Sequence, residues 1–275
     1  MQMSTVDDLS ESLRNGQLIL FIGAGVSMSL GLPSYSKLIH EIGEQLEYDG
    51  EVFHGLGDYL TLAEYYHLKK KGLKELQDYM RKKWEKPDAE IKQSRLHKAI
   101  VDLGKSIIYT TNFDGFLEKA FRLHNKPYKA ISSVQDLVNI RADATQIIKL
   151  HGDVNTPSKT VFTESSYFER LSFESPLDIK LRSDALGKSI LFMGYSLSDI
   201  NIRYLIYRLN KQWESENSKS FQPKSYIYIG KPNPVQEEVL KSRGIIPVIA
   251  ESDDQNESLI QFLTKIKEAS TLKTQ

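Results

Sequence analysis

The chain has no cysteine among its 275 residues, and this absence limits both its covalent and its metal chemistry. Disulfides are excluded, which fits a reducing compartment, and so is a structural zinc site built from thiolates. The histidines do not replace the missing thiolates, because they lie far apart, without the short paired spacing of a metal site. They are His40, His54, His67, His97, His124 and His151. The sequence therefore predicts no zinc and no other metal site.

Long apolar runs and an excess of charge of one sign are also missing. No apolar stretch approaches the roughly 18 residues of a membrane span, and the first residues, MQMSTVDDLSES, are acidic and polar, unlike a secretion signal. Lys and Arg together number 36, and so do Asp and Glu, which leaves no net field to attract nucleic acid or an anionic membrane. We expect a soluble, cytoplasmic protein with no membrane partner and no sequence-specific nucleic-acid binding.

The most informative segment that is present covers residues 18 to 33, LILFIGAGVSMSLGLP. An apolar strand runs into Gly23, Ala24 and Gly25, where the backbone can turn sharply and approach a ligand without an intervening Cβ. Free N–H groups at this turn are expected to meet a pyrophosphate. The dinucleotide fingerprint Gly-x-Gly-x-x-Gly fails at its third place, Met28, and no acidic residue ends a second strand about 20 residues on. An ordinary Rossmann dehydrogenase is therefore disfavoured.

Short segments rich in Ile, Leu, Val or Tyr alternate with helical patterns along most of the chain. Six are expected to be strands: residues 17–22, 106–110, 146–150, 189–193, 225–229 and 245–249. Between them lie stretches such as 198–213, where apolar residues recur at spacings of three and four. This alternation predicts an α/β fold, with a Rossmann-like parallel sheet flanked by helices.

Residues from about 48 to 104 break the alternation, because they carry helical patterns only. We expect one domain over residues 1–275, in which this helical insertion forms a small domain or a lid. Within it, an apolar stripe of Leu73, Leu76, Met80 and Trp84 is surrounded by lysines and arginines. A packed helix with a solvated basic face is the favoured interpretation, and a basic surface for a partner protein or nucleic acid is the alternative.

Three further polar motifs follow predicted strands: Thr110-Thr111-Asn112-Phe113-Asp114, His151-Gly152-Asp153 and Gly194-Tyr195-Ser196. Parallel strands place ligand-binding loops at their carboxyl ends, so these motifs and the Gly-Ala-Gly turn are expected to meet at one edge of the sheet. In order and content, the four motifs resemble those of the sirtuin superfamily. The longer run Gly-Ala-Gly-x-Ser-x-x-x-Gly-x-Pro is similar to the family's first NAD-binding motif.

This resemblance implies a site for NAD⁺ in which Asn112 and His151 are catalytic. It implies cofactor contacts for nine residues: Gly23, Ala24, Gly25, Ser27, Pro33, Thr111, Asp114, Gly194 and Ser196. The residue types suit these roles, because an Asn side chain can hold a ribose hydroxyl or a water and a neutral His can accept a proton.

Three acidic residues near these motifs have a second interpretation as helix caps. Asp114 either has a role in the site, by orienting a partner or by stabilising positive charge, or caps the helix that follows it, and both possibilities stay open. Asp153 and Asp199 are left outside the catalytic set, because Asp after a strand or near a helix start commonly binds backbone N–H groups.

Two departures from the family's protein deacylases point to water as the acceptor. Those enzymes carry a zinc module of four cysteines, which this chain lacks, and commonly a Phe-Arg pair where Ser34-Tyr35-Ser36 follows Pro33. The chain looks like the sirtuin-like NAD⁺ hydrolases of bacterial antiphage defence, which release nicotinamide and ADP-ribose in abortive infection. The alternatives are a sirtuin-type protein deacylase or ADP-ribosyltransferase and a non-enzymatic sensor that binds NAD⁺ or ADP-ribose.

The same resemblance implies how such an activity is controlled. We expect the chain to be little more than a catalytic domain, to form a homo-oligomer and to depend on a separate sensor or activator, such as a HerA-type ATPase or a short Argonaute. Whether NADP⁺ is also cleaved stays open, because no acidic residue marks the ribose hydroxyl.

Overall fold

The computed structural model describes residues 2–104, 106–155, 160–172, 174–195, 199–215 and 218–272, with side chains from residue 4 onward. Within these residues the centre is a seven-stranded sheet of order β3-β4-β2-β1-β5-β6-β7, in which every pair is parallel. The strands are β1 (Leu18–Ile22), β2 (Ile107–Thr110), β3 (Tyr128–Ile131), β4 (Thr145–Lys149), β5 (Ser189–Met193), β6 (Ser225–Ile229) and β7 (Ile245–Ile249). The expected Rossmann-like α/β fold is confirmed.

Six strands lie within one residue of their expected bounds, and the seventh, β3, was not predicted. It is a four-residue edge strand that pairs only with β4, and Ile131 alone among its residues is buried. A segment with one buried residue has no apolar periodicity, so its sequence, YKAI, gives no strand signal.

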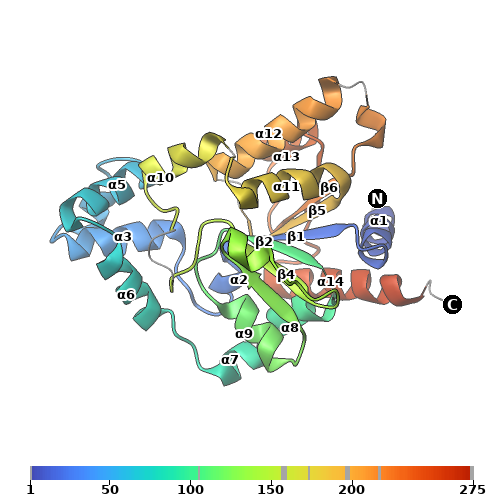
Figure 1. The fold of residues 1–275 in the computed structure, drawn as a ribbon, viewed down its shortest axis with the longest axis horizontal. Helices are drawn as coiled ribbons and strands as arrows, with labels where there is room; N and C mark the ends of the chain where they lie inside the picture. The colour runs from blue at the N-terminus through green and yellow to red at the C-terminus, as the bar shows by residue number, and fades with distance from the viewer. Residues whose placement is uncertain are drawn as a thin grey trace.

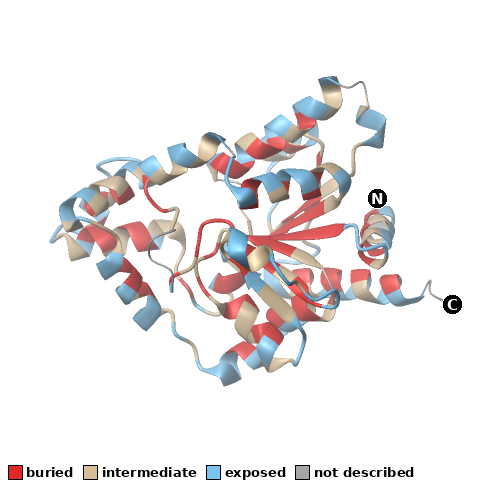
Figure 2. Ribbon diagram, viewed as in Figure 1, coloured by how far each residue is buried: buried red, intermediate tan, exposed pale blue. Residues whose placement is uncertain are grey.

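Helices cover both faces of the sheet, as Figure 1 shows, and Figure 2 shows the buried strands between them. Alternate residues of β1 enter two cores: Leu18, Leu20 and Ile22 join one, and Ile19 and Phe21 join the other. The first core also takes α1 (Gln2–Arg14), α7 (Asp88–Gln93), α8 (Arg95–Asp102), α9 (Phe116–Leu123) and α14 (Gln255–Leu272). The second takes α11 (Pro176–Gly187), α12 (Ile200–Ser215) and α13 (Pro234–Ser242).

A third core joins part of the helix-only stretch to the helix before it and lies to the left of the sheet in Figure 1. It gathers α3 (Tyr35–Gln45), α4 (Gly50–His54), α5 (Tyr59–Lys70) and α6 (Lys74–Lys83), together with Val154 and Phe162. The expected insertion is thus helical, but its last helices, α7 and α8, pack on the sheet. In α6, Leu76 and Met80 are buried, as a packed helix requires.

The remaining short elements connect these layers. They are α2 (Ala24–Met28), α10 (Glu164–Glu169), and the 3₁₀ turns η1 (Val134–Leu137), η3 (Arg170–Ser172) and η4 (Lys219–Phe221). Among the described residues, no helix combines the length and apolarity that crossing a membrane requires. In the same part of the chain, no three His, Asp or Glu side chains are grouped to hold a metal ion.

Candidate active site

The four predicted motifs meet at the carboxyl ends of four adjacent strands, β4, β2, β1 and β5. Gly23 directly follows β1, Thr111 follows β2, Gly194 follows β5, and His151 lies two residues beyond β4. The chain moves outward from β1 through β2 and then returns to the other side of β1 with β5. Such a reversal of strand order opens a crevice in parallel sheets, where ligands bind.

The Gly-Ala-Gly turn is joined to the loop after β5 by backbone hydrogen bonds. The Gly23 N–H donates to the Met193 carbonyl at 2.9 Å, and the Gly25 N–H donates to the Gly194 carbonyl at 2.8 Å. A Cβ on Gly23 would lie 2.4 Å from the Gly194 oxygen, so only glycine permits this approach. The expectation of free amides is therefore wrong for these two residues, whose N–H groups hold a neighbouring loop. Ala24 is exposed at the start of α2.

Gly23→Ala is expected to lower the free energy of unfolding by about 1–3 kcal/mol, because the new Cβ meets backbone that cannot move aside easily. The matched control is Gly187→Ala, where an added Cβ meets no atom within 4 Å. Alanine suits the end of α11 better than glycine does, so this control should leave stability equal or slightly higher. Urea unfolding of both variants measures the difference, and equal losses would contradict the close-approach argument.

Asn112 occupies the centre of a buried polar cluster at the ends of β1 and β2. Its Nδ2 donates to the Gly23 carbonyl and to the Ser27 Oγ, both at 3.1 Å. Ser27 Oγ in turn donates to Asp114 Oδ2 at 2.8 Å. Asp114 Oδ1 accepts from the N–H of Phe116, the first residue of α9, at 3.0 Å, so this side chain binds the start of a helix whose N-cap is Gly115 and also joins the cluster.

His151 is buried after β4, with 2% of its surface exposed. Its Nε2 lies 3.3 Å from Asp199 Oδ2, and its Nδ1 lies 3.5 Å from the Tyr167 hydroxyl of α10. Burial lowers the pKa of His151 to about 4, although the Asp199 carboxylate opposes the shift. The imidazole is therefore neutral near pH 7 and has a lone pair available for a proton.

The free energy of unfolding is expected to fall as the pH drops from about 6.5 toward 4. Burial lowers the pKa of His97 to about 4 as well, whereas an unfolded His titrates near 6.5. Between these values the unfolded chain binds protons that the folded chain excludes. Stability that is fully present above pH 6.5 is thus lost toward pH 4, by up to about 3 kcal/mol per His. Urea unfolding between pH 7 and 5 measures the slope. His97→Leu should flatten it, and an unchanged slope would contradict the assignment.

The structure shows fewer contacts for the other predicted site residues. Thr111 lies beside the hydroxyl of Tyr195, and Pro33 is half-buried directly before the Ser34 cap of α3. Ser196 lies outside the described residues. Gly194 has φ +62°, a left-handed conformation that favours glycine.

Lys149 is a site residue that the sequence analysis missed. It is 2% exposed, and its Nζ donates to the Asp114 carbonyl at 2.6 Å and pairs with Glu118 at 3.2 Å and with Asp153. Burial opposes its charge, but the carboxylates of Glu118 and Asp153 outweigh burial and raise the pKa of Lys149. A lysine inside the apolar strand TQIIK was the signal that could have revealed it.

The two acids set aside as caps do bind backbone amides. Asp153 accepts from Asn155, and Asp199 accepts from Asn201 and Ile202 at the start of α12. Each also has a second partner in the candidate site, because Asp153 pairs with the buried Lys149 and Asp199 approaches His151. Tyr167 gave no signal, since it follows His151 by 16 positions in a different element.

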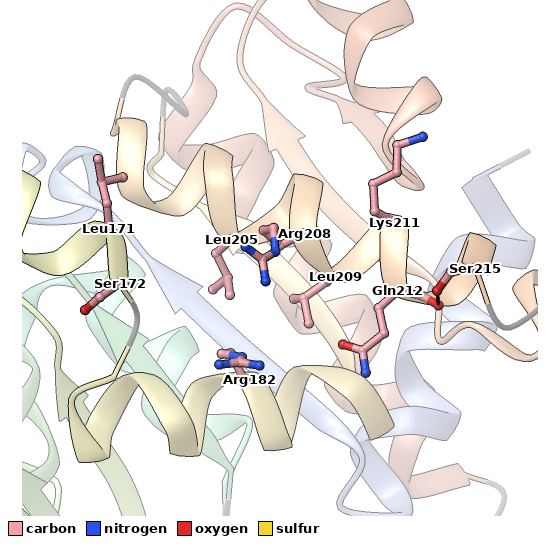
Figure 3. Close-up of a pocket in the computed structure, with 9 residues that line it drawn as sticks. All are labelled: Leu171, Ser172, Arg182, Leu205, Arg208, Leu209, Lys211, Gln212 and Ser215. Atoms are coloured by element: carbon pink, nitrogen blue, oxygen red, sulfur yellow. Dashed lines mark hydrogen bonds between the residues drawn. The ribbon is translucent and has the colours of Figure 1, made fainter.

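A separate groove of about 570 Å³ lies between α11 and α12 (Figure 3). Arg182 of α11 and Leu205 and Leu209 of α12 point into it. None of the predicted site residues lines it.

Comparison with known proteins places this chain in a family. Residues 106–248, just over half of the chain, match the family model of the SIR2-like domain. A protein named NAD(+) hydrolase ThsA, from Bacillus cereus (strain MSX-D12), is 28% identical over 224 residues, which are 78% of this chain and 44% of that protein.

Two further relatives extend this similarity. NAD(+) hydrolase ThsA of Enterococcus faecium is 28% identical over 200 residues, 72% of this chain and 41% of its own length. Defense-associated sirtuin 2 of Bacillus subtilis is 27% identical over 247 residues, 86% of this chain and 23% of its own length. The chain therefore spans less than half the length of each of these three relatives.

Proposed function

The chain belongs to the family of SIR2-like domains, and from this premise we propose that it hydrolyses NAD⁺ to nicotinamide and ADP-ribose. The observation that carries the proposal is the arrangement of Asn112 and His151, which stand on adjacent strand ends beside the Gly-Ala-Gly turn. Two relatives named NAD(+) hydrolase support it, since each is similar over more than 70% of this chain.

In the proposed reaction, the bond between the nicotinamide nitrogen and C1′ of the ribose breaks. Its electron pair leaves with nicotinamide, which thereby loses its positive charge, and the ribose becomes oxocarbenium-like. Water then forms the new bond to C1′ and gives up a proton, so the products are nicotinamide, ADP-ribose and H⁺. Holding the ring and positioning the acceptor are what such a site contributes.

His151 is proposed to take the proton from the attacking water, because its neutral imidazole can act as a general base near pH 7. Asn112 is proposed to hold the ribose or the water, with its amide fixed by Gly23 and Ser27. The Asp114 carboxylate is buried within the same cluster, where it would stabilise the developing positive charge of the sugar. The remaining predicted contacts, including Pro33, Thr111 and Ser196, are proposed to bind the rest of NAD⁺.

The proposal is tested directly by measuring, with chromatography, how much nicotinamide is released from NAD⁺. The purified chain is incubated with NAD⁺, alone and with the product of a neighbouring gene. Equimolar nicotinamide and ADP-ribose are expected, whereas NAD⁺ binding without release under every condition would favour a sensor. Formation of acyl-ADP-ribose from an acylated peptide would favour a protein deacylase. The same assay with NADP⁺ defines cofactor preference.

We further propose that the activity serves antiphage defence as a toxic effector, since one relative is named a defence-associated sirtuin. A separate activator and a homo-oligomer are proposed with it, the candidate activators being a HerA-type ATPase or a short Argonaute. Cellular NAD⁺ is expected to fall after phage infection only in cells that carry the active chain. Full activity of an isolated monomer would contradict the need for an activator.

A further inference from the structure

Two side chains outside the motif residues approach His151 at the edge of the candidate site, and a third binds the backbone beside it. Asp199 Oδ2 lies 3.3 Å from Nε2, and the Tyr167 hydroxyl lies 3.5 Å from Nδ1. The Tyr167 hydroxyl also donates to Asp199 Oδ2 at 3.4 Å, so Tyr167, Asp199 and the His151 ring each lie close to the other two. Arg170 binds the carbonyl of Leu150, the residue before His151.

The two oxygens of the Asp199 carboxylate have different partners. Oδ1 accepts from the N–H groups of Asn201 and Ile202, at 2.9 and 3.2 Å, and so caps α12. Oδ2 faces Tyr167 and His151 instead. A helix cap needs only one carboxylate oxygen, and an exposed Asp can supply it. The Asp199 side chain, however, is only 9% exposed. Burying a carboxylate is unfavourable, so its second oxygen requires an explanation beyond the cap.

We propose that Asp199 is a positioning residue that keeps the proton of neutral His151 on Nε2 and leaves the lone pair on Nδ1. The inference rests on the proposed hydrolase function, in which His151 is the base. A lone pair on Nε2 would lie 3.3 Å from a carboxylate oxygen, which is repulsive, whereas an N–H there is attracted to it. A neutral imidazole carries one proton, so a partner that holds the proton on Nε2 leaves Nδ1 without one. The preference for an N–H on Nε2 therefore sets the tautomer.

The same carboxylate stabilises His151 after it has accepted a proton. Water gives its proton to Nδ1, Nε2 keeps its own, and the imidazolium then faces the Asp199 anion without transfer of a proton to it. The other charged groups that act on the ring oppose each other, since Arg170 disfavours the imidazolium and Asp178 of α11 favours it. Asp199 is therefore the main group that offsets the burial of His151.

The contact in this structure is an approach and not yet a formed hydrogen bond. Nε2 of His151 has no hydrogen-bond partner among the described residues, and 3.3 Å is longer than a strong charge-assisted bond. Catalytic hydrogen bonds are often long before substrate binds and shorten in the reacting complex. Formation of this hydrogen bond requires the ring to turn its Nε2–H toward Asp199.

Asp199→Asn tests the inference, because asparagine keeps the cap of α12 and removes the charge. The ¹⁵N shifts of the His151 ring, measured by NMR in the full chain, report both tautomer and pKa. The wild type is expected to hold the proton on Nε2, and the variant to lose this preference and to titrate at lower pH. The matched control is Asp49→Asn, another capping Asp, whose Oδ1 binds Glu51 and Val52 far from His151.

Kinetics supply the second measurement. In Asp199→Asn the kcat for nicotinamide release is expected to fall about 10- to 100-fold, which is less than the about 10²- to 10⁴-fold that a general base contributes. KM should change little, because Asp199 is not proposed to touch NAD⁺.

An unchanged tautomer and pKa of His151 in Asp199→Asn would overturn the inference, and so would an equal change in Asp49→Asn. If the wild type releases no nicotinamide, the proposed function fails, but the NMR measurement still decides whether Asp199 sets the state of His151. The two failures are therefore distinguishable.

Discussion

Nicotinamide release is expected to fall about 10²- to 10⁴-fold in His151→Ala, the range that general acid–base catalysis usually contributes. The alanine removes the neutral imidazole, so the attacking water keeps its proton until the solvent takes it. Initial rates of nicotinamide release at saturating NAD⁺ measure the loss. The matched control is His67→Ala on α5, where the His side chain is 44% exposed and remote from the motifs.

Asn112→Ala is expected to cause a loss of similar size by a different route. It removes the hydrogen bonds from Nδ2 to Gly23 and Ser27, which hold the first and second motifs together. Both variants must therefore be shown to fold and to bind NAD⁺, by urea unfolding and by calorimetry. Rates within threefold of the wild type in folded His151→Ala would contradict its role as base.

Lys149→Met is expected to reduce the free energy of unfolding by about 3–5 kcal/mol, the usual result of removing one partner from a buried ion pair. The ammonium group is the buried counterion of Glu118 and Asp153, and it also binds the carbonyls of Phe113 and Asp114. Without the ammonium group, the carboxylates of Glu118 and Asp153 repel each other in a site of low dielectric constant. The loop after β2 also loses the hydrogen bonds that its carbonyls accept from Lys149.

Urea unfolding near pH 7 measures this loss, with Lys98→Met as the matched control. Lys98 pairs with Asp102 on the exposed side of α8, and such surface pairs contribute about 0–1 kcal/mol. Adding Glu118→Gln to Lys149→Met should restore part of the stability, because burial already raises the pKa of Glu118 and its neutral form is tolerated. A loss below about 1 kcal/mol in Lys149→Met would contradict the anchoring role.

The sheet could be predicted because its strands are buried on both faces. All five residues of β1 are buried, and strands of this kind appear in the sequence as short apolar runs. β3 was missed since its single buried residue leaves no such run. Sequence periodicity also could not divide the helix-only stretch, where α6 packs in the third core while α8 packs on the sheet.

The site was predictable where a residue follows a strand directly, as Asn112 follows β2. It was not predictable where contact depends on distant elements. Tyr167 reaches His151 from α10, and Asp199 reaches it from the start of α12, although Asp199 had been recognised as a cap. The role of the glycines differs from the expected one. The N–H groups of Gly23 and Gly25 were expected to be free for a ligand, but they donate to the β5 end and the loop after it.

The burial of Asn112 and His151, the proposed catalytic pair, has a consequence for regulation. His151 is 2% exposed and Asn112 8%, so the proposed contact of NAD⁺ with both side chains would require the chain to open around them. When a binding-competent form is a fraction of all molecules, the apparent Kd is the intrinsic Kd divided by that fraction, so about 1% open means about 100-fold weaker binding. An activator that recognises only the open form would restore the affinity for NAD⁺ without contacting the site. The chain would then be inactive because few molecules are open, and no inhibitor would have to be removed.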